Sequence, residues 1–163
     1  NATLGSELFN GTDKGVNLFD SAGGGTEVSF EYSSGEWIAT GNGGDAIAVL
    51  YLSDKSLNGG LSSDLDANSV YKITFDAKEE NGGVAIQIIG DHNRTIHLET
   101  TYTSYTTYLK TNPTSTDTNH YIRFISLGNT EKGYIKNISV KKVNGNAGVM
   151  INMPNNAIET DTP

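Results

Sequence analysis

The side chains best suited to contact a ligand in this chain are aromatic. Tyr102, Tyr105 and Tyr108 follow one another at three-residue intervals in the threonine-rich segment 100–110. Because side chains alternate along a strand, Tyr102 and Tyr108 should point outward and Tyr105 into a core. An outward tyrosine offers a ring for stacking on a sugar and a hydroxyl for hydrogen bonding. The alternative is ordinary cross-strand packing between tyrosine and threonine.

The single tryptophan, Trp37, lies in the segment 36–40 between glycine-rich turns. Its indole could serve as a stacking platform with a polar N–H edge. It could equally anchor one sheet from inside the core, as buried tryptophans do in other sandwiches, and this second interpretation is favoured. Tyr51 and Tyr32 are further candidates for outward aromatic contacts.

Residues typical of catalysis or metal binding show no converging pattern. The three histidines, His92, His97 and His120, are scattered, and a metal site needs three or four ligands that converge. Most carboxylates fall in turns, no nucleophile or phosphate-loop motif is present, and cysteine is absent. We therefore expect no catalytic residue, no metal ligand and no enzymatic activity.

The net charge of the chain restricts the classes of partner that it can be expected to bind. The formal net charge of the 163 residues is -8, whereas binding to a phosphate backbone needs clustered lysine and arginine. Neither nucleic acid nor an anionic membrane is an expected partner. No apolar run approaches the ~18–20 residues that span a bilayer. The first residues resemble no signal peptide and include no methionine, which predicts a processed chain or a piece of a longer one.

Period-two alternation and frequent glycine-rich turns predict an all-β sandwich. The clearest strand is 69–78, where Tyr71, Ile73, Phe75 and Ala77 should face the core and Asp76 and Lys78 the solvent. The nearly continuous apolar runs 46–52 and 84–89 should lie centrally, with both faces covered. The other expected strands are 27–32, 36–40, 95–99, 105–110, 121–126 and 133–143.

The closing strand 133–143 alternates and leads into a polar-apolar tail. Tyr134, Ile138 and Val140 share one parity, expected to be dry, and Asn137, Ser139 and Lys141 share the other. We expect one domain over 1–143 and an extended C-terminal arm over 144–163. The arm lacks lysine and arginine, and its apolar side chains should dock at a subunit contact: Met150, Ile151, Met153 and Ile158.

Several segments together resemble the family 4/9-type carbohydrate-binding module. These are the opening Gly5-Ser-Glu-Leu8 with Asn10-Gly-Thr12, the strand Tyr71-Lys-Ile-Thr-Phe-Asp-Ala77, and the closing Ile135-Lys-Asn-Ile-Ser-Val-Lys-Lys-Val143. The Asn144-Gly-Asn146 exit and the tail after it resemble modules in structural proteins of tailed bacteriophages.

The resemblance implies a jelly-roll β-sandwich of two antiparallel sheets that binds sugars through aromatic side chains. It also implies a structural calcium, for which the family typically uses an aspartate at the position held here by Lys136. Lysine cannot ligate calcium, which needs oxygen donors. We therefore expect no cofactor and regard a calcium site as doubtful.

Two functions from different classes follow. The first is a non-enzymatic virion protein of a tailed phage, a capsid decoration or tail-fibre module on the virion surface. It would assemble with other virion proteins or with itself, for example as a trimer, and engage host-surface glycans through Trp37, Tyr102, Tyr108 and Tyr51. The alternative is an accessory carbohydrate-binding module of a secreted polysaccharide-degrading enzyme, which would be monomeric.

Overall fold

The fold is described from a computed structural model of the chain. It describes residues 2–9, 16–20, 29–41, 46–52, 61–63, 65–111 and 120–145, with backbone alone for 16–20, 46 and 51. The predicted arm residues Met150, Ile151, Met153 and Ile158 lie outside the described residues. Within the described ranges no helix is long and apolar enough to cross a membrane.

The described elements are strands. Each of the expected strands is present, to within two residues at each end, and β1 and β2 are additional. The bounds are β1 (Thr3–Glu7), β2 (Val16–Asp20), β3 (Ser29–Ser33), β4 (Glu36–Thr40), β5 (Ala46–Tyr51), β6 (Val70–Glu80), β7 (Ala85–Ile89), β8 (Arg94–His97), β9 (Thr103–Lys110), β10 (Tyr121–Leu127) and β11 (Lys132–Asn144).

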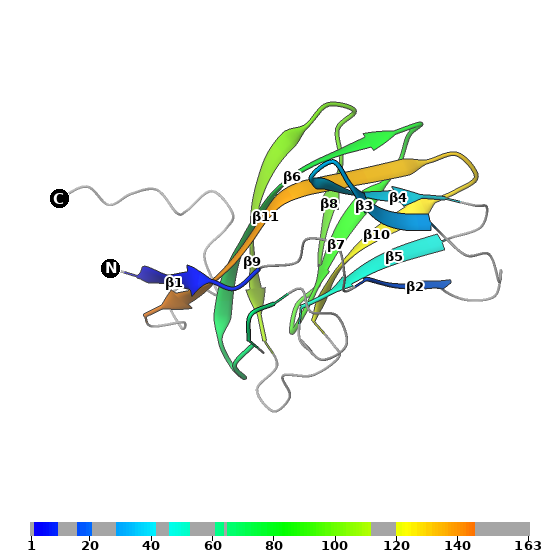
Figure 1. The fold of residues 1–163 in the computed structure, drawn as a ribbon. Helices are drawn as coiled ribbons and strands as arrows, with labels where there is room; N and C mark the ends of the chain where they lie inside the picture. Colours follow the sequence, from blue (N-terminus) through cyan, green and yellow to red (C-terminus); the bar gives the residue numbers. More distant parts are fainter. Residues whose placement is uncertain are drawn as a thin grey trace.

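The strands form two antiparallel sheets that pack face to face (Figure 1). The six-stranded sheet has the order β3-β4-β11-β6-β9, and β1 also pairs with β11. The five-stranded sheet has the order β2-β5-β10-β7-β8. The predicted all-β jelly-roll sandwich is confirmed.

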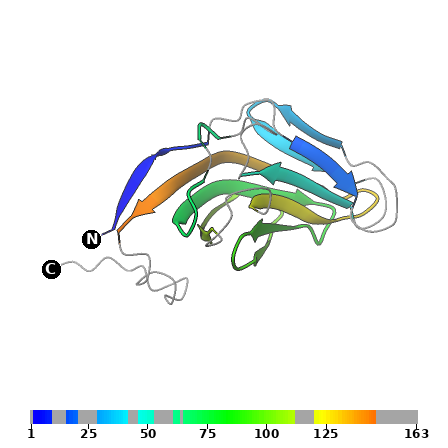
Figure 2. The ribbon, with the colours of Figure 1, turned by 90° about the horizontal axis from the view of Figure 1, so that it is seen from below.

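The long strand β11 organises the six-stranded sheet. Its first half pairs with β4 and its last residues pair with β1, both on the flank opposite β6. Figures 1 and 2 both show β1 and the end of β11 running side by side beyond the body of the sandwich. The N-terminal strand is therefore held by one partner strand, and its outer edge is unpaired among the described residues.

The core lies between the sheets and follows the alternation predicted for β6. Tyr71, Ile73, Phe75 and Ala77 are each at most 2 % exposed, as expected. Gly133 of β11 lies against the ring of Phe124 from the other sheet, where an added Cβ would come within 2.4 Å of a ring carbon. Close contact between the layers therefore requires glycine at this position.

The apolar runs in β5 and β7 are buried on both faces, which confirms the prediction for them. Ala48 and Leu50 face the core, while Val49 faces outward and is nevertheless 0 % exposed. Both strands have a neighbour on each side in the five-stranded sheet.

The facing predicted for β11 is wrong for Tyr134. Ile135 is buried and Tyr134 lies on the outer face, beside Lys78 of β6. The cause is a β-bulge: the pairing with β6 shifts between Lys136 and Ser139, and Asn137 adopts a φ of 53°. An extra residue at a bulge exchanges the two faces of the strand. Val140, beyond the bulge, is buried as expected.

Candidate functional site

Trp37 lies in the core and not on a ligand-accessible surface. It is 3 % exposed, and its ring packs against Phe30 (5.5 Å between centroids) and Tyr32 (5.0 Å). Its buried Nε1 has no hydrogen-bond partner among the described residues. A ring so enclosed has no free face for a sugar, and the geometry favours the core interpretation of Trp37.

The tyrosines in β9 and just before it face as the alternation predicts. Tyr105 is half-buried and packs on Phe75, with 5.5 Å between ring centroids. Tyr102, 36 % exposed, and Tyr108, half-buried opposite Lys72, lie on the outer face of the six-stranded sheet. The backbone of Tyr51 lies in β5, but its side chain is outside the described residues.

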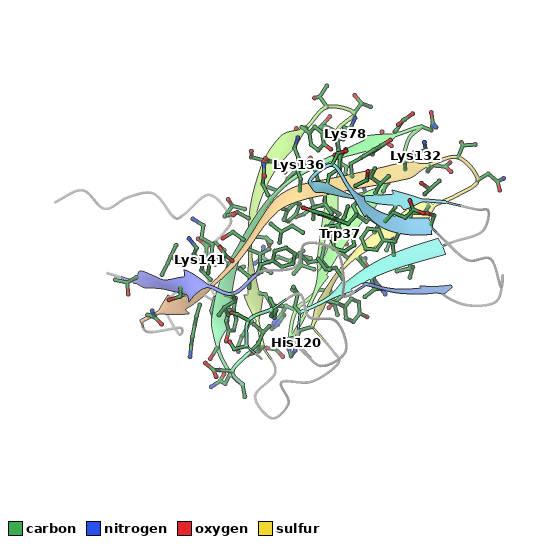
Figure 3. The ribbon with its side chains drawn as sticks, in the orientation of Figure 1. Trp37, Lys78, His120, Lys132, Lys136 and Lys141 are labelled. Carbon is green, nitrogen blue, oxygen red and sulfur yellow. The ribbon has the colours of Figure 1, made fainter. Side chains whose placement is uncertain are left out.

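Tyr102 belongs to a lysine–tyrosine cluster formed by Lys78, Tyr102, Tyr134 and Lys136. The Lys136 ammonium lies 3.7 Å from the centroid of the Tyr102 ring. The Lys78 ammonium lies 5.2 Å from the Tyr102 centroid and 4.5 Å from that of Tyr134. Figure 3 shows Lys78 and Lys136 close together on neighbouring strands. Cations over aromatic rings are attracted by the ring quadrupole.

Carboxylates complete this cluster. The Tyr102 hydroxyl donates to Glu36, and the Tyr134 hydroxyl donates to Glu80 at 2.6 Å. Burial and, next, the bond to Glu80 raise the pKa of Tyr134 to about 12. The ring faces and hydroxyls of Tyr102 and Tyr134 thus already have partners inside the protein. This arrangement stabilises the sheet, and a sugar at Tyr102 would have to compete with Lys136 for the ring and with Glu36 for the hydroxyl.

The position at which the resemblance implies a calcium ligand belongs to the same cluster. Lys136 contributes an ammonium and no oxygen, and the nearby Asp76 carboxylate accepts hydrogen bonds from Ser104 and from Asn137 (2.7 Å). These hydrogen bonds lower the pKa of Asp76. In the described part of the chain no group of three or more His, Cys, Asp or Glu could hold a metal ion. The donor set described here does not fit calcium.

Glu7 of β1 is surrounded by donors. Its carboxylate accepts the backbone N–H of Val140 at 2.7 Å and that of Phe9 at 3.0 Å, and also the hydroxyl of Ser139. The Lys141 ammonium lies 3.9 Å away. Burial raises the pKa of Glu7, but these hydrogen bonds and Lys141 together outweigh it and lower the pKa. Glu7 therefore ties the N-terminal strand to β11 at the point where the pairing is irregular.

The outer face of the five-stranded sheet holds a different set of side chains, which sequence reasoning missed. Register places Val49, Arg123, Gln87 and Thr95 side by side across β5, β10, β7 and β8. Arg123 lies between the buried Ile122 and Phe124, so its side chain points away from the core. The parity of Tyr121 and Arg123 was visible in the sequence, but their neighbours on other strands were not.

Hydrogen bonds join three of these side chains into the Arg123 row, defined as Arg123, Gln87 and Thr95. Arg123 Nε donates to Gln87 Oε1 at 2.8 Å, and Gln87 Nε2 donates to Thr95 Oγ1 at 3.0 Å. The Arg123 guanidinium also lies 5.7 Å from the centroid of the Tyr121 ring. A guanidinium and an amide are thus fixed beside an aromatic ring on an outward face.

Comparison with solved structures agrees with this architecture. A structure of CBM4, a carbohydrate-binding module, matches with a TM-score of 0.55 and 16 % identity, covering 78 % of this chain and 86 % of that chain. The chain has a carbohydrate-binding-module fold. A mutant of a family 29 carbohydrate-binding module matches with a TM-score of 0.53 and 19 % identity, covering 86 % and 92 %.

Another mutant structure from family 29, made to study ligand recognition, matches with a TM-score of 0.52 and 19 % identity, covering 86 % of each chain. No protein-family model matches the sequence, and no curated protein matches it significantly. The resemblance seen in the sequence is therefore supported at the level of the fold.

Proposed function

We propose that the chain is a non-catalytic glycan-binding module and that the glycan lies on the outer face of the five-stranded sheet. The observation that supports this most is the Arg123 row next to Tyr121. The fold, similar to that of carbohydrate-binding modules, makes a sugar the first ligand to test.

The chemistry of the row suits a sugar. A pyranose presents hydroxyls around its rim and C–H groups on its face, so a binding surface needs fixed polar groups and an aromatic ring. The contacts of Arg123 to Gln87 and Tyr121 hold its guanidinium before a ligand arrives. Less side-chain entropy is then lost on binding.

The polar members of the row keep part of their surface exposed. Thr95 is exposed and Arg123, Gln87 and Tyr121 are half-buried, while Val49 and Ile89 beside them are buried and pack beneath the row. On the opposite sheet, by contrast, the Tyr102 ring already contacts Lys136 and its hydroxyl is hydrogen-bonded to Glu36. The five-stranded sheet therefore offers the better ligand surface.

A glycan-array screen followed by affinity measurements on variants tests the proposal. Arg123→Ala and Tyr121→Ala should each weaken binding to the best glycan by about tenfold or more, as central contacts do. Tyr108→Ala on the other sheet is the matched control and should leave affinity within about twofold. Loss of affinity in Tyr108→Ala alone would place the glycan on the six-stranded sheet and contradict this proposal.

For the biological setting we propose the virion surface of a tailed phage, as a capsid decoration or tail-fibre module; the alternative is a secreted polysaccharide-degrading enzyme. The protruding pair of β1 and β11 supports a subunit contact, since Leu4 on β1 is 47 % exposed. Light scattering tests this, because a virion module should be an oligomer such as a trimer and an accessory module a monomer.

A further inference from the structure

Acidic residues are distributed unevenly between the two sheets. The strands β5, β7, β8 and β10 contain no aspartate or glutamate, and β2 contributes only Asp20 at its end. The six-stranded sheet contains Glu7, Glu31, Glu36, Asp76, Glu79 and Glu80. In a chain of net charge -8, the five-stranded sheet is nearly free of negative side chains.

Arg123 is the cation at the middle of that sheet. Its neighbours in register, Val49 and Gln87, are uncharged, and it contacts the Gln87 amide and the Tyr121 ring. No ion pair found among the described residues includes Arg123. Lysines of the other sheet do have carboxylates close by, as Lys142 has Asp66 at 2.7 Å.

A half-buried guanidinium that has no carboxylate partner among the described residues can still pair with an anion. It has lost part of its hydration, and only Nε is bonded to Gln87, which leaves the terminal nitrogens as donors. Carboxylate and sulfate oxygens match such a fork in a bidentate manner, with stronger bonds than neutral hydroxyls give.

We propose that the Arg123 row binds glycans that carry an anionic group, a uronate carboxylate or a sulfate, and that Arg123 pairs with this group. This inference rests on the proposed glycan-binding function and specifies its ligand class. In this arrangement Arg123 contacts the anion, Gln87 fixes the guanidinium, and Tyr121 contacts the ring of the same or the next sugar.

The net negative charge of the chain does not prevent this. Packed sheets are about 10 Å apart, so the acidic outer face lies farther than one sheet spacing from Arg123. At physiological ionic strength the Debye length is about 8 Å, and repulsion from that face is largely screened. Binding should therefore depend on the contact between Arg123 and the anionic group, and the affinity should fall as the salt concentration rises.

Oligogalacturonate and its fully methyl-esterified form provide a matched pair of probes, because the sugar backbone is the same and each carboxylate becomes an uncharged methyl ester. Calorimetry with the full chain should give affinity for the acid at least about tenfold above that for the ester. Dextran sulfate against dextran is the parallel pair for sulfate, and it identifies which anion is preferred.

Variants separate the contact between Arg123 and the anionic group from the effect of overall charge. Arg123→Gln should abolish the preference for the acid. Arg123→Lys should keep part of it, because lysine retains the positive charge but lacks the paired N–H donors of the guanidinium. Lys136→Gln, on the opposite sheet, changes net charge equally and should keep the preference. Melting curves of each variant confirm that it is folded.

The outcomes separate the two proposals. Equal affinity for acid and ester, and for sulfated and plain dextran, overturns the ligand class while glycan binding stands. A preference that Lys136→Gln reduces as much as Arg123→Gln does assigns it to overall charge and overturns the role of Arg123. Absence of binding to any array glycan or probe overturns the proposed function and this inference together.

Discussion

The ammonium of Lys136 lies 3.7 Å from the centroid of the Tyr102 ring. This contact joins two residues singled out in the sequence for different reasons, one as a substitution in an implied calcium site and one as a sugar platform. In the structure the two side chains are partners of each other, with the ammonium of Lys136 over the ring of Tyr102. The outer face of the six-stranded sheet is therefore a network satisfied within the protein, and the ligand surface is better sought on the other sheet.

A double-mutant cycle on this contact should show a small favourable coupling. Removing Lys136 and Tyr102 singly and together, as Lys136→Gln and Tyr102→Leu, should give a coupling of about 0.5–1 kcal/mol in unfolding free energy, as expected for exposed cation–π pairs. Urea denaturation measures it. A coupling near zero would mean that the contact contributes nothing to stability.

The core alternation of β6 predicts a large difference between adjacent positions. Phe75→Ala should destabilise the protein by about 3–5 kcal/mol, because it removes a buried ring and leaves a cavity. Thr74→Ala, one residue away on the outer face, should stay within about 0.5 kcal/mol. Denaturant titration compares the two. A similar loss in both variants would contradict the facing of this strand.

Glu7 predicts a pH-dependent contribution to stability. Its pKa is lower in the folded protein than the ordinary value of 4.5, so its contribution is present above pH 4.5 and is lost as pH falls through the folded pKa. Glu7→Gln should cost about 1 kcal/mol at pH 7, a modest value because water screens a side chain that is 38 % exposed.

The comparison of Glu7→Gln with the unchanged chain should be made at pH 7 and at pH 3. The difference in unfolding free energy should narrow at the lower pH, because below the ordinary pKa of 4.5 the contribution of the ionised carboxylate begins to be lost. A difference that is constant or grows on acidification would show that the ionised carboxylate is not what stabilises the contact with β11.

Calcium should have no marked effect on stability. Lys136 supplies an ammonium where the resemblance implies a carboxylate, and Glu7 and Asp76 already accept hydrogen bonds from several donors. Melting temperatures in millimolar calcium and in chelator should agree within about 1 °C. A rise of several degrees with calcium would contradict this, because a ligand that binds only the folded state stabilises it.

Sequence periodicity predicted which face of a strand a side chain occupies wherever the alternation is regular. The facing of Tyr71 to Ala77 in β6 and the outward direction of Tyr102 and Tyr108 follow from side-chain parity alone. Tyr134 was predicted on the wrong face because a bulge at Asn137 depends on pairing with β6, which spacing along one strand does not reveal.

Other features depend on contacts between distant segments. The strand β1 has a single large apolar residue, Leu4, and is held by Glu7 reaching β11, so it has no strong periodic signal. The bond from Arg123 to Gln87 joins residues 36 positions apart in the sequence. Only the register of β10 against β7 brings them together, which is why the proposed surface was not predicted.

The most direct test locates the bound glycan on the molecule. Backbone amide shifts of the labelled chain should be followed by NMR during titration with the best glycan from the array. The account predicts that the largest changes fall in 85–89, 94–97 and 121–125, around the Arg123 row. Changes concentrated in 102–108 and 132–136 would place the ligand on the lysine–tyrosine cluster and contradict the account.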